Sequence, residues 1–191
     1  MIEVELKATL NVEQAAVLPA RLTALGFTAQ PPVEETDLYW NGVDRDFCKT
    51  DEALRLRRAR NADGTESAFL TYKGTLLDAE TSSRPEHELR VDSAECAERL
   101  LRALGYQPTR PLRKLRRSYF RGTICACLDE IAELGTFLEL EILLPDIAPD
   151  DASAVAQLFA LLDRLGVSRS ALTQKSYLDQ LLSLPPNRCR K

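Results

Sequence analysis

Short runs along this chain alternate between apolar and charged residues with a period of two, which is typical of strands that bury one face. The first run covers residues 2–7, where Val4 and Leu6 are interleaved with charged residues. The same parity recurs at residues 54–57, 70–73, 86–91, 114–118, 125–129 and 138–142. Each run has one apolar or mostly apolar face, so the sequence predicts antiparallel strands whose other face is charged.

Segments of helical character separate these strand groups. We predict helices at residues 12–25, 93–104 and 151–165, and a shorter one at 175–184. Asn11 can cap the first helix, and Asp92 with Glu95 resembles a capping arrangement for the second. The first three helices each end in Leu-Gly followed by an apolar residue, which predicts a left-handed glycine at each C-terminus.

The order of these elements favours a single α+β domain, spanning residues 1–184, followed by a disordered tail at 185–191. We expect the helices to cover the outer apolar faces of a closed antiparallel β-barrel, whose charged faces then enclose a hydrated channel. Residues 60–66 are expected to form a hairpin loop, and residues 74–83 a lid.

Composition narrows the possible partners. The formal net charge is −4 and the sequence pI is about 5.2, so no global basic field exists to hold nucleic acid or an anionic membrane. Neither a signal peptide nor a membrane-spanning run is recognisable. The five cysteines are odd in number and include no C-x-x-C pair, which favours a reduced cytoplasm. The outward apolar faces could support a homodimer.

The charged faces carry like-signed pairs two residues apart, such as Arg55 with Arg57 and Glu139 with Glu141. Such pairs repel, and a ligand of opposite sign would remove the repulsion. Arg and Lys suit phosphate oxygens, whereas paired carboxylates suit Mg²⁺ or Mn²⁺. The pattern therefore indicates a site for a metal–polyphosphate complex, with an ordinary solvated strand face as the alternative.

The chain resembles the CYTH, or triphosphate tunnel metalloenzyme, family. The opening Glu3-x-Glu5-x-Lys7 matches the defining motif of that family. Within the family the chain is most similar to the class IV adenylyl cyclase-like branch. The resemblance spans nearly the whole chain in six ordered blocks, at residues 3–7, 70–74, 83–88, 114–119, 128–141 and 175–178.

The resemblance implies a role for each matching residue, in a tunnel that binds a triphosphate-containing small molecule such as ATP with Mg²⁺ or Mn²⁺. Glu3, Glu5 and Lys7 are expected to be catalytic. The implied metal ligands are Glu3, Glu5, Glu86, Glu88, Asp129, Glu139 and Glu141. The implied triphosphate ligands are Lys7, Arg55, Arg57, Lys73, Arg84, Lys114, Arg116 and Lys175.

Three residues within these blocks are not expected to line the channel. Arg117 and Glu130 have the wrong parity for the lumen and are expected to be solvated. His87 is the only histidine, and it lies on the opposite strand face from Glu86 and Glu88, which favours a packing or surface role.

Three functions fit this pattern. The first is a cyclase, in which the ribose 3′-hydroxyl of ATP attacks the α-phosphorus and gives cyclic AMP and pyrophosphate. The second is a hydrolase acting on inorganic triphosphate, thiamine triphosphate or nucleoside triphosphates. The third is a non-catalytic polyphosphate-binding module, which is disfavoured because anion binding alone does not require so many carboxylates. The sequence does not decide between the first two.

Overall fold

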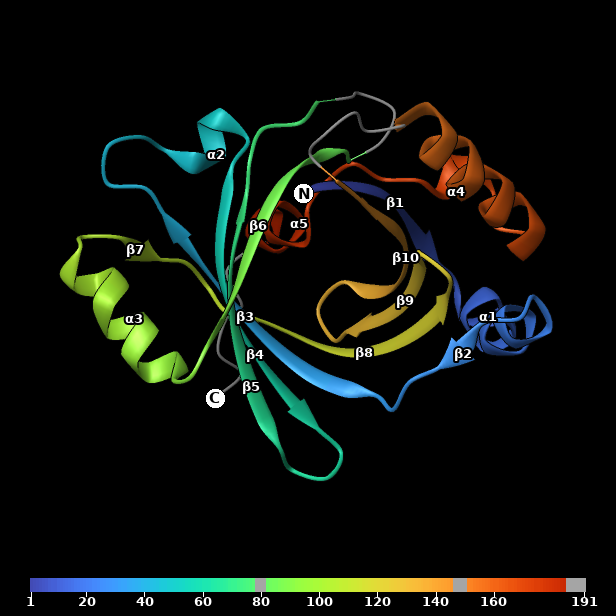
Figure 1. Cartoon of the computed structure of the whole chain (residues 1–191), viewed down its shortest axis with the longest axis horizontal. Helices are drawn as coiled ribbons and strands as arrows, with labels where there is room; N and C mark the ends of the chain where they lie inside the picture. Colours follow the sequence, from blue (N-terminus) through green and yellow to red (C-terminus); the bar gives the residue numbers. More distant parts are fainter. Residues whose placement is uncertain (78–81, 146–150, 185–191) are drawn as a thin grey trace.

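The centre of the protein is an antiparallel sheet that closes on itself (Figure 1). The computed structural model describes residues 1–77, 82–145 and 151–184. Within these residues eight long strands form the barrel in the order β8, β9, β10, β1, β6, β5, β4, β3, and β3 pairs with β8 to close it. The predicted closed barrel is therefore confirmed. The strands are β1 (Ile2–Leu10), β3 (Val33–Asn41), β4 (Ala53–Asn61), β5 (Glu66–Lys73), β6 (Arg84–Val91), β8 (Leu112–Arg121), β9 (Ile124–Ile131) and β10 (Gly135–Leu144), with β2 (Thr28–Ala29) and β7 (Gln107–Pro108) as short additions at its rim.

The helices lie around this barrel. Figure 1 shows α1 (Val12–Ala24) and α4 (Asp151–Leu165) on one side and α3 (Ala94–Ala103) on the opposite side. All three were predicted, but the N-cap of α3 is Ser93 and not Asp92, because the Ser93 hydroxyl accepts a hydrogen bond from the Cys96 amide. The four-residue α2 (Phe47–Thr50) was not predicted, since it is too short to show a helical period. Among the described residues, no helix has the length and apolar character needed to cross a bilayer.

The C-termini of these three helices follow the predicted pattern. Gly26, Gly105 and Gly166 have φ values of 83°, 90° and 68°. In each case the amide of the next residue donates back to a carbonyl of the last turn, at 3.0 Å from Phe27, 3.0 Å from Tyr106 and 3.2 Å from Val167. The helices therefore end in the left-handed motif that satisfies orphan carbonyl groups.

The alternation in β1 explains how the barrel can be charged inside and still be stable. Val4, Leu6 and Ala8 point outward and are buried against α1 and α4 in the main hydrophobic core. A second core lies under α3 and includes Trp40 and Leu56. Both cores are outside the barrel, so the apolar stabilisation of this fold does not depend on the lumen.

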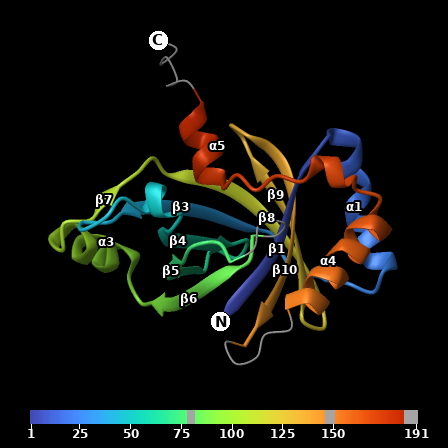
Figure 2. The ribbon, with the colours of Figure 1, turned by 90° about the horizontal axis from the view of Figure 1, so that it is seen from above.

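The last helix, α5 (Tyr177–Ser183), begins at one end of the lumen, and Figure 2 shows it projecting away from the barrel there. Tyr177 and Leu181 pack there against inward-facing apolar residues of β8, β9 and β10. The chain reaches this position along β1, where the Thr173 amide donates to the Lys7 carbonyl at 2.9 Å. α5 also begins later than predicted, with Ser176 as its N-cap.

Two predicted loops have different outcomes. The hairpin loop between β4 and β5 is confirmed, with Gly64 at a φ of 84°. The expected lid at 74–83 contains residues 78–81, which lie outside the described residues, as does the expected tail at 185–191. At the described edge of the lid, the Ser82 amide donates to the Glu5 carbonyl at 3.1 Å.

A charged channel as candidate active site

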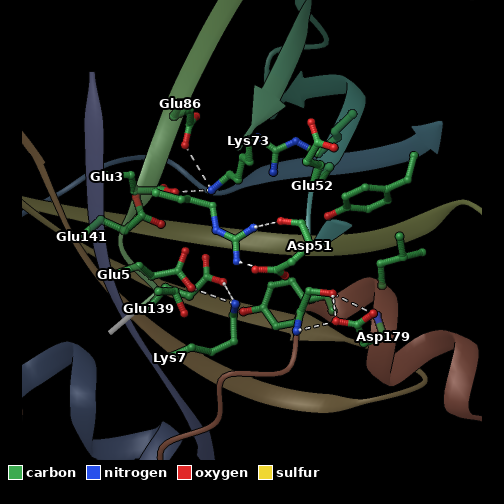
Figure 3. A pocket seen from close by; sticks show the side chains of 18 of the residues that line it. Glu3, Glu5, Lys7, Asp51, Glu52, Lys73, Glu86, Glu139, Glu141 and Asp179 are labelled. Carbon is green, nitrogen blue, oxygen red and sulfur yellow. Dashed lines mark hydrogen bonds and ion pairs between the residues drawn. The ribbon is translucent and has the colours of Figure 1, made fainter. Parts of the chain in front are cut away.

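The lumen contains a cavity of about 320 Å³ whose walls are dominated by charged side chains. Figure 3 shows acidic and basic groups from separate strands converging on it. Most of the residues predicted to bind metal or phosphate line this cavity: Glu3, Glu5, Lys7, Arg55, Arg57, Lys73, Arg84, Glu86, Glu88, Lys114, Arg116, Glu139 and Glu141.

Three carboxylates form the most acidic part of the wall, and we call Glu3, Glu5 and Glu141 the acidic trio. One carboxylate oxygen from each lies within 4.8 Å of the other two. Glu5 of β1 lies directly opposite Glu141 of β10 in the strand register, and Glu3 follows on the same face of β1. Because Glu3 and Glu5 are buried, their mutual repulsion is poorly screened by solvent.

Two carboxylates of the trio, Glu3 and Glu141, have raised pKa values, and burial is the largest cause for each. Burial is the main cause that raises the pKa of Glu3, which Lys73 only partly offsets. Burial also raises the pKa of Glu141 well above its usual value, with Cys127 adding to the effect and Arg116 opposing it. These carboxylates are thus short of positive charge, and hard oxygen donors in this state fit Mg²⁺ or Mn²⁺.

Glu139 behaves in the opposite way. Burial opposes its ionisation, but Lys7, Arg116 and Lys114 outweigh burial and hold its pKa well below the usual value. Lys7 lies 3.2 Å from Glu139 and 2.8 Å from Glu5. Glu139 is therefore already neutralised by the protein.

Most cations of the opposite wall are also neutralised, by carboxylates of neighbouring strands. The Arg57 guanidinium donates to both carboxylate oxygens of Asp37, at 2.7 and 2.8 Å, and its Nη1 lies 3.1 Å from Glu35. Burial disfavours the charge on Asp37, yet Arg57 and Arg55 together lower its pKa. The repulsion between Arg55 and Arg57 is thus partly relieved within the protein, because β3 supplies the counter-charges Glu35 and Asp37, which were not predicted from the sequence.

The same arrangement occurs beside β8. Lys114 lies 3.0 Å from Asp129, and Arg116 donates to both oxygens of Asp129 at 2.7 and 2.6 Å. The Tyr177 hydroxyl donates a further bond of 3.1 Å to the same carboxylate. Asp129 was predicted to contact metal, but here its oxygens are occupied by these three donors, which indicates that it positions Lys114 and Arg116.

Arg55 is the exception among the arginines and lysines of the opposite wall. Its Nε makes no hydrogen bond among the described residues. Its nearest carboxylates are Asp37 at 3.7 Å and Glu88 at 4.0 Å, and its one close partner is the Thr71 hydroxyl at 3.2 Å. Because Arg55 lines the cavity and its ion pairs with Asp37 and Glu88 are long, its terminal guanidinium nitrogens can donate to an anionic ligand there.

Other predicted residues take different positions. Lys73 contacts Glu3 and lies 3.1 Å from Glu86. Arg84 lines the cavity near its edge, where it donates to the carbonyls of Asp51 and Gly74 at 3.3 and 3.2 Å. Lys175 is exposed and is not part of the cavity wall.

The two parity predictions are confirmed. Arg117 and Glu130 form an ion pair with each other and are both more than one-third exposed, away from the lumen. His87 stacks on Tyr72, with ring centroids 6.3 Å apart.

Several groups on the inner face of the barrel or in the cavity wall were not predicted from the sequence, and Figure 3 shows the cavity-lining Asp51, Glu52 and Asp179 among them. Glu35 and Asp37 lie on β3, whose alternation of residues 35, 37 and 39 with apolar Leu38 and Trp40 was the available signal. Tyr177 lies over Lys7, with its ring centroid 4.6 Å from Nζ, and comes from a helix whose position at the end of the barrel no local pattern reveals.

Comparison with known proteins finds relatives that match nearly the whole chain. A family model described as the CYTH domain matches residues 1–177. A protein of Methanocaldococcus jannaschii, whose name assigns it provisionally to the adenylate cyclases, is 36% identical over 179 residues, which cover 94% of this chain and 98% of the relative.

Solved structures show the same fold. The PH1819 protein of Pyrococcus horikoshii has a TM-score of 0.83 and 33% identity, covering 94% of this chain and 98% of that one. A Hippeastrum protein, described as an adenylyl cyclase candidate with a dominant triphosphatase activity, has a TM-score of 0.68 and 18% identity, covering 97% of each chain. At that identity the second likeness concerns the fold alone.

The contrast between Glu141 and Glu139 predicts opposite effects of pH on two matched variants in chelator. A carboxyl whose pKa is raised in the folded state costs stability as pH rises from the unfolded value towards the folded value, so Glu141→Gln should stabilise the protein at about pH 8 and not at about pH 4. A carboxyl whose pKa is depressed contributes stability above the unfolded pKa, so Glu139→Gln should destabilise at about pH 8, with the loss shrinking on acidification. Urea unfolding across this range measures both, and shifts of the same sign in the two variants would contradict the charge assignment.

Proposed function

The chain belongs to the CYTH domain family, and from that premise we propose that it is a metal-dependent enzyme acting on a triphosphate, with ATP as substrate and cyclic AMP and pyrophosphate as products. The proposal is supported mainly by one observation: the acidic trio and Arg55 line the same cavity, and the Nε of Arg55 has no hydrogen-bond partner among the described residues. Carboxylates can bind the metal ion and the arginine can bind phosphate oxygens, so such a cavity suits a metal–triphosphate complex.

The acidic trio would hold Mg²⁺ or Mn²⁺, and Glu86 and Glu88, which also line the cavity, are the candidates for a second metal position. When bound, the metal supplies positive charge that polarises phosphoryl oxygens. The donor set fits, because it consists of oxygen ligands that the protein leaves short of positive charge. We exclude Asp129 from this set of metal ligands, because its oxygens already accept hydrogen bonds from Lys114, Arg116 and Tyr177.

The cations of the cavity then have a second role. Lys7 contacts Glu5 and Lys73 contacts Glu3, although Lys73 does not outweigh the effect of burial on Glu3. Glu3 and Glu5 would turn to a bound metal, and Lys7 and Lys73, which would keep Glu139 and Glu86 as partners, would then have donors for phosphate oxygens, together with Arg55. A triphosphate carries about four negative charges, so this exchange keeps the buried channel close to neutral.

The same cations suit the reaction. A leaving pyrophosphate gains negative charge as its bond to the α-phosphorus breaks. Arg55, Lys73 and Lys7 are held in place by neighbouring strands, so they stabilise that charge without reorganising. Adenylyl cyclase activity is favoured over other uses of this chemistry by the 36% identity to the relative from M. jannaschii.

Triphosphate hydrolysis is the second candidate. The charged groups described above all address phosphates or metal, so they would serve attack by water on the terminal phosphorus equally well. The Hippeastrum protein, which shares the fold, is described as having such an activity. A cytoplasmic location is also proposed, supported by the free thiols of Cys48, Cys96, Cys125 and Cys127.

The test is a product assay with ATP in Mg²⁺, in Mn²⁺ and in chelator. We expect cyclic AMP and pyrophosphate in either metal and no turnover in chelator. Glu3→Gln should abolish most of this turnover, because a neutral amide is a poor ligand for a hard cation, while leaving metal-free stability equal or higher. ADP and phosphate as products would favour the hydrolase, and full activity in chelator or in Glu3→Gln would contradict a metal site at the trio.

Substituting the two inward-facing arginines of β4, one at a time, should distinguish a role in substrate binding from a role in stability. Arg55→Ala should raise the Michaelis constant for the triphosphate roughly 10- to 100-fold with little change in stability, because it removes one or two charge-assisted hydrogen bonds. Arg57→Ala should lower the free energy of unfolding by about 3–5 kcal/mol, because it leaves Asp37 fully buried without its main partner.

Denaturant unfolding and steady-state kinetics on both arginine variants make this comparison. Arg57→Lys keeps the charge near Asp37 and serves as the matched control for the loss of the bidentate contact. Equal Michaelis constants in the wild type and in Arg55→Ala would show that Arg55 does not bind substrate.

A further inference from the structure

Two free thiols lie beside the acidic trio. Cys125 and Cys127 face the lumen from β9, and their sulfur atoms are 3.4 Å apart. In the strand register Cys125 is opposite Glu141, and Cys127 is opposite Glu139. Both sulfurs and one oxygen of Glu141 lie within 4.8 Å of one another, so these three residues form a second convergent ligand set that shares Glu141 with the trio.

We propose that Cys125, Cys127 and Glu141 form a binding site for a thiophilic divalent cation such as Zn²⁺, and that its occupation withdraws Glu141 from the acidic trio. Thiolate sulfur prefers zinc to magnesium, and two Cys with one carboxylate leave the fourth tetrahedral position for water. Two sulfurs bound to one tetrahedral zinc at about 2.3 Å lie about 3.8 Å apart, close to the separation found here.

Access and charge also suit such an ion. Glu141 lines the cavity and Cys125 is only half-buried, so an ion can enter from the channel. Each thiol loses its proton to solvent as its sulfur coordinates, which gives two thiolates and one carboxylate around a divalent ion and a net charge of −1. Arg116, whose Nη1 lies 3.7 Å from Glu141, can balance this charge.

The shared ligand makes the two sites antagonistic. Glu141 can direct its carboxylate to the thiols or to Glu3 and Glu5, which lie on the neighbouring strand β1. With zinc bound, the trio is reduced to two carboxylates, each contacted by a lysine. We therefore expect zinc to weaken binding of Mg²⁺ or Mn²⁺ to the trio; the loss of activity that would follow rests on the proposed function.

The binding itself is tested with Co²⁺, which replaces zinc and gives a thiolate-to-metal charge-transfer band. Titrating the full chain with Co²⁺ should produce this band with one equivalent, and Zn²⁺ should abolish it. Cys125→Ser and Cys127→Ser should each weaken Co²⁺ binding at least tenfold, whereas Cys96→Ser, an exposed thiol on α3, should not change it. Absence of the band, or its persistence in both lumen variants with their melting temperatures unchanged, would overturn the site.

The coupling is tested by activity. Zn²⁺ should inhibit turnover in the wild type and in Cys96→Ser, and inhibition should be at least tenfold weaker in Cys125→Ser, with its basal activity unchanged. Equal zinc inhibition in the wild type and in Cys125→Ser would overturn the coupling, because zinc would then act at the carboxylates alone. A cobalt band in a protein without any triphosphate-dependent turnover would refute the proposed function while supporting the thiol site.

Discussion

Pairing of buried charges inside the barrel is the constraint on which this structure depends. An isolated charge in a low-dielectric interior is unstable, and loss of one partner from a buried pair costs several kcal/mol. The barrel meets this constraint between strands, since Asp37 of β3 holds Arg57 of β4, and Asp129 of β9 holds Lys114 and Arg116 of β8. The strand order that closes the sheet is thus also the order that places opposite charges side by side.

This pairing explains why the apolar cores lie outside. A lumen filled with ion pairs contributes little net stability, because desolvation offsets most of the Coulomb attraction. The outer faces of β1 and β10 supply the apolar burial instead, against α1 and α4. The apolar contacts of Tyr177 and Leu181 lie at one end of the channel, so the channel has charged walls and one apolar end.

The sequence predicts the parts of this arrangement that are local. Period-two alternation identified the inward residues of seven strands, and the Leu-Gly signals identified three helix ends, because each is decided within a few residues. The β3 strand was missed because Glu34 and Glu35 are adjacent charges, and Thr36 and Asp37 are adjacent polar residues, which obscures its alternation. Which cation each carboxylate neutralises depends on the strand register, and the position of Tyr177 depends on tertiary packing; no single run of sequence contains either fact.

The register also decides which groups remain available for chemistry. Glu5 and Glu141 lie opposite each other, so β1 and β10 bring like charges together at one level of the barrel, whereas Lys7 opposite Glu139 forms a pair at the next. A shift of one residue would turn every inward side chain outward, and a shift of two would pair Glu5 with Glu139 or with Leu143 and change the acidic set. The three carboxylates of the trio therefore lie at one part of the cavity wall and Arg55, whose nearest carboxylates are 3.7 and 4.0 Å away, at another, so the channel offers separate positions for the metal and for the phosphates of a metal–triphosphate complex.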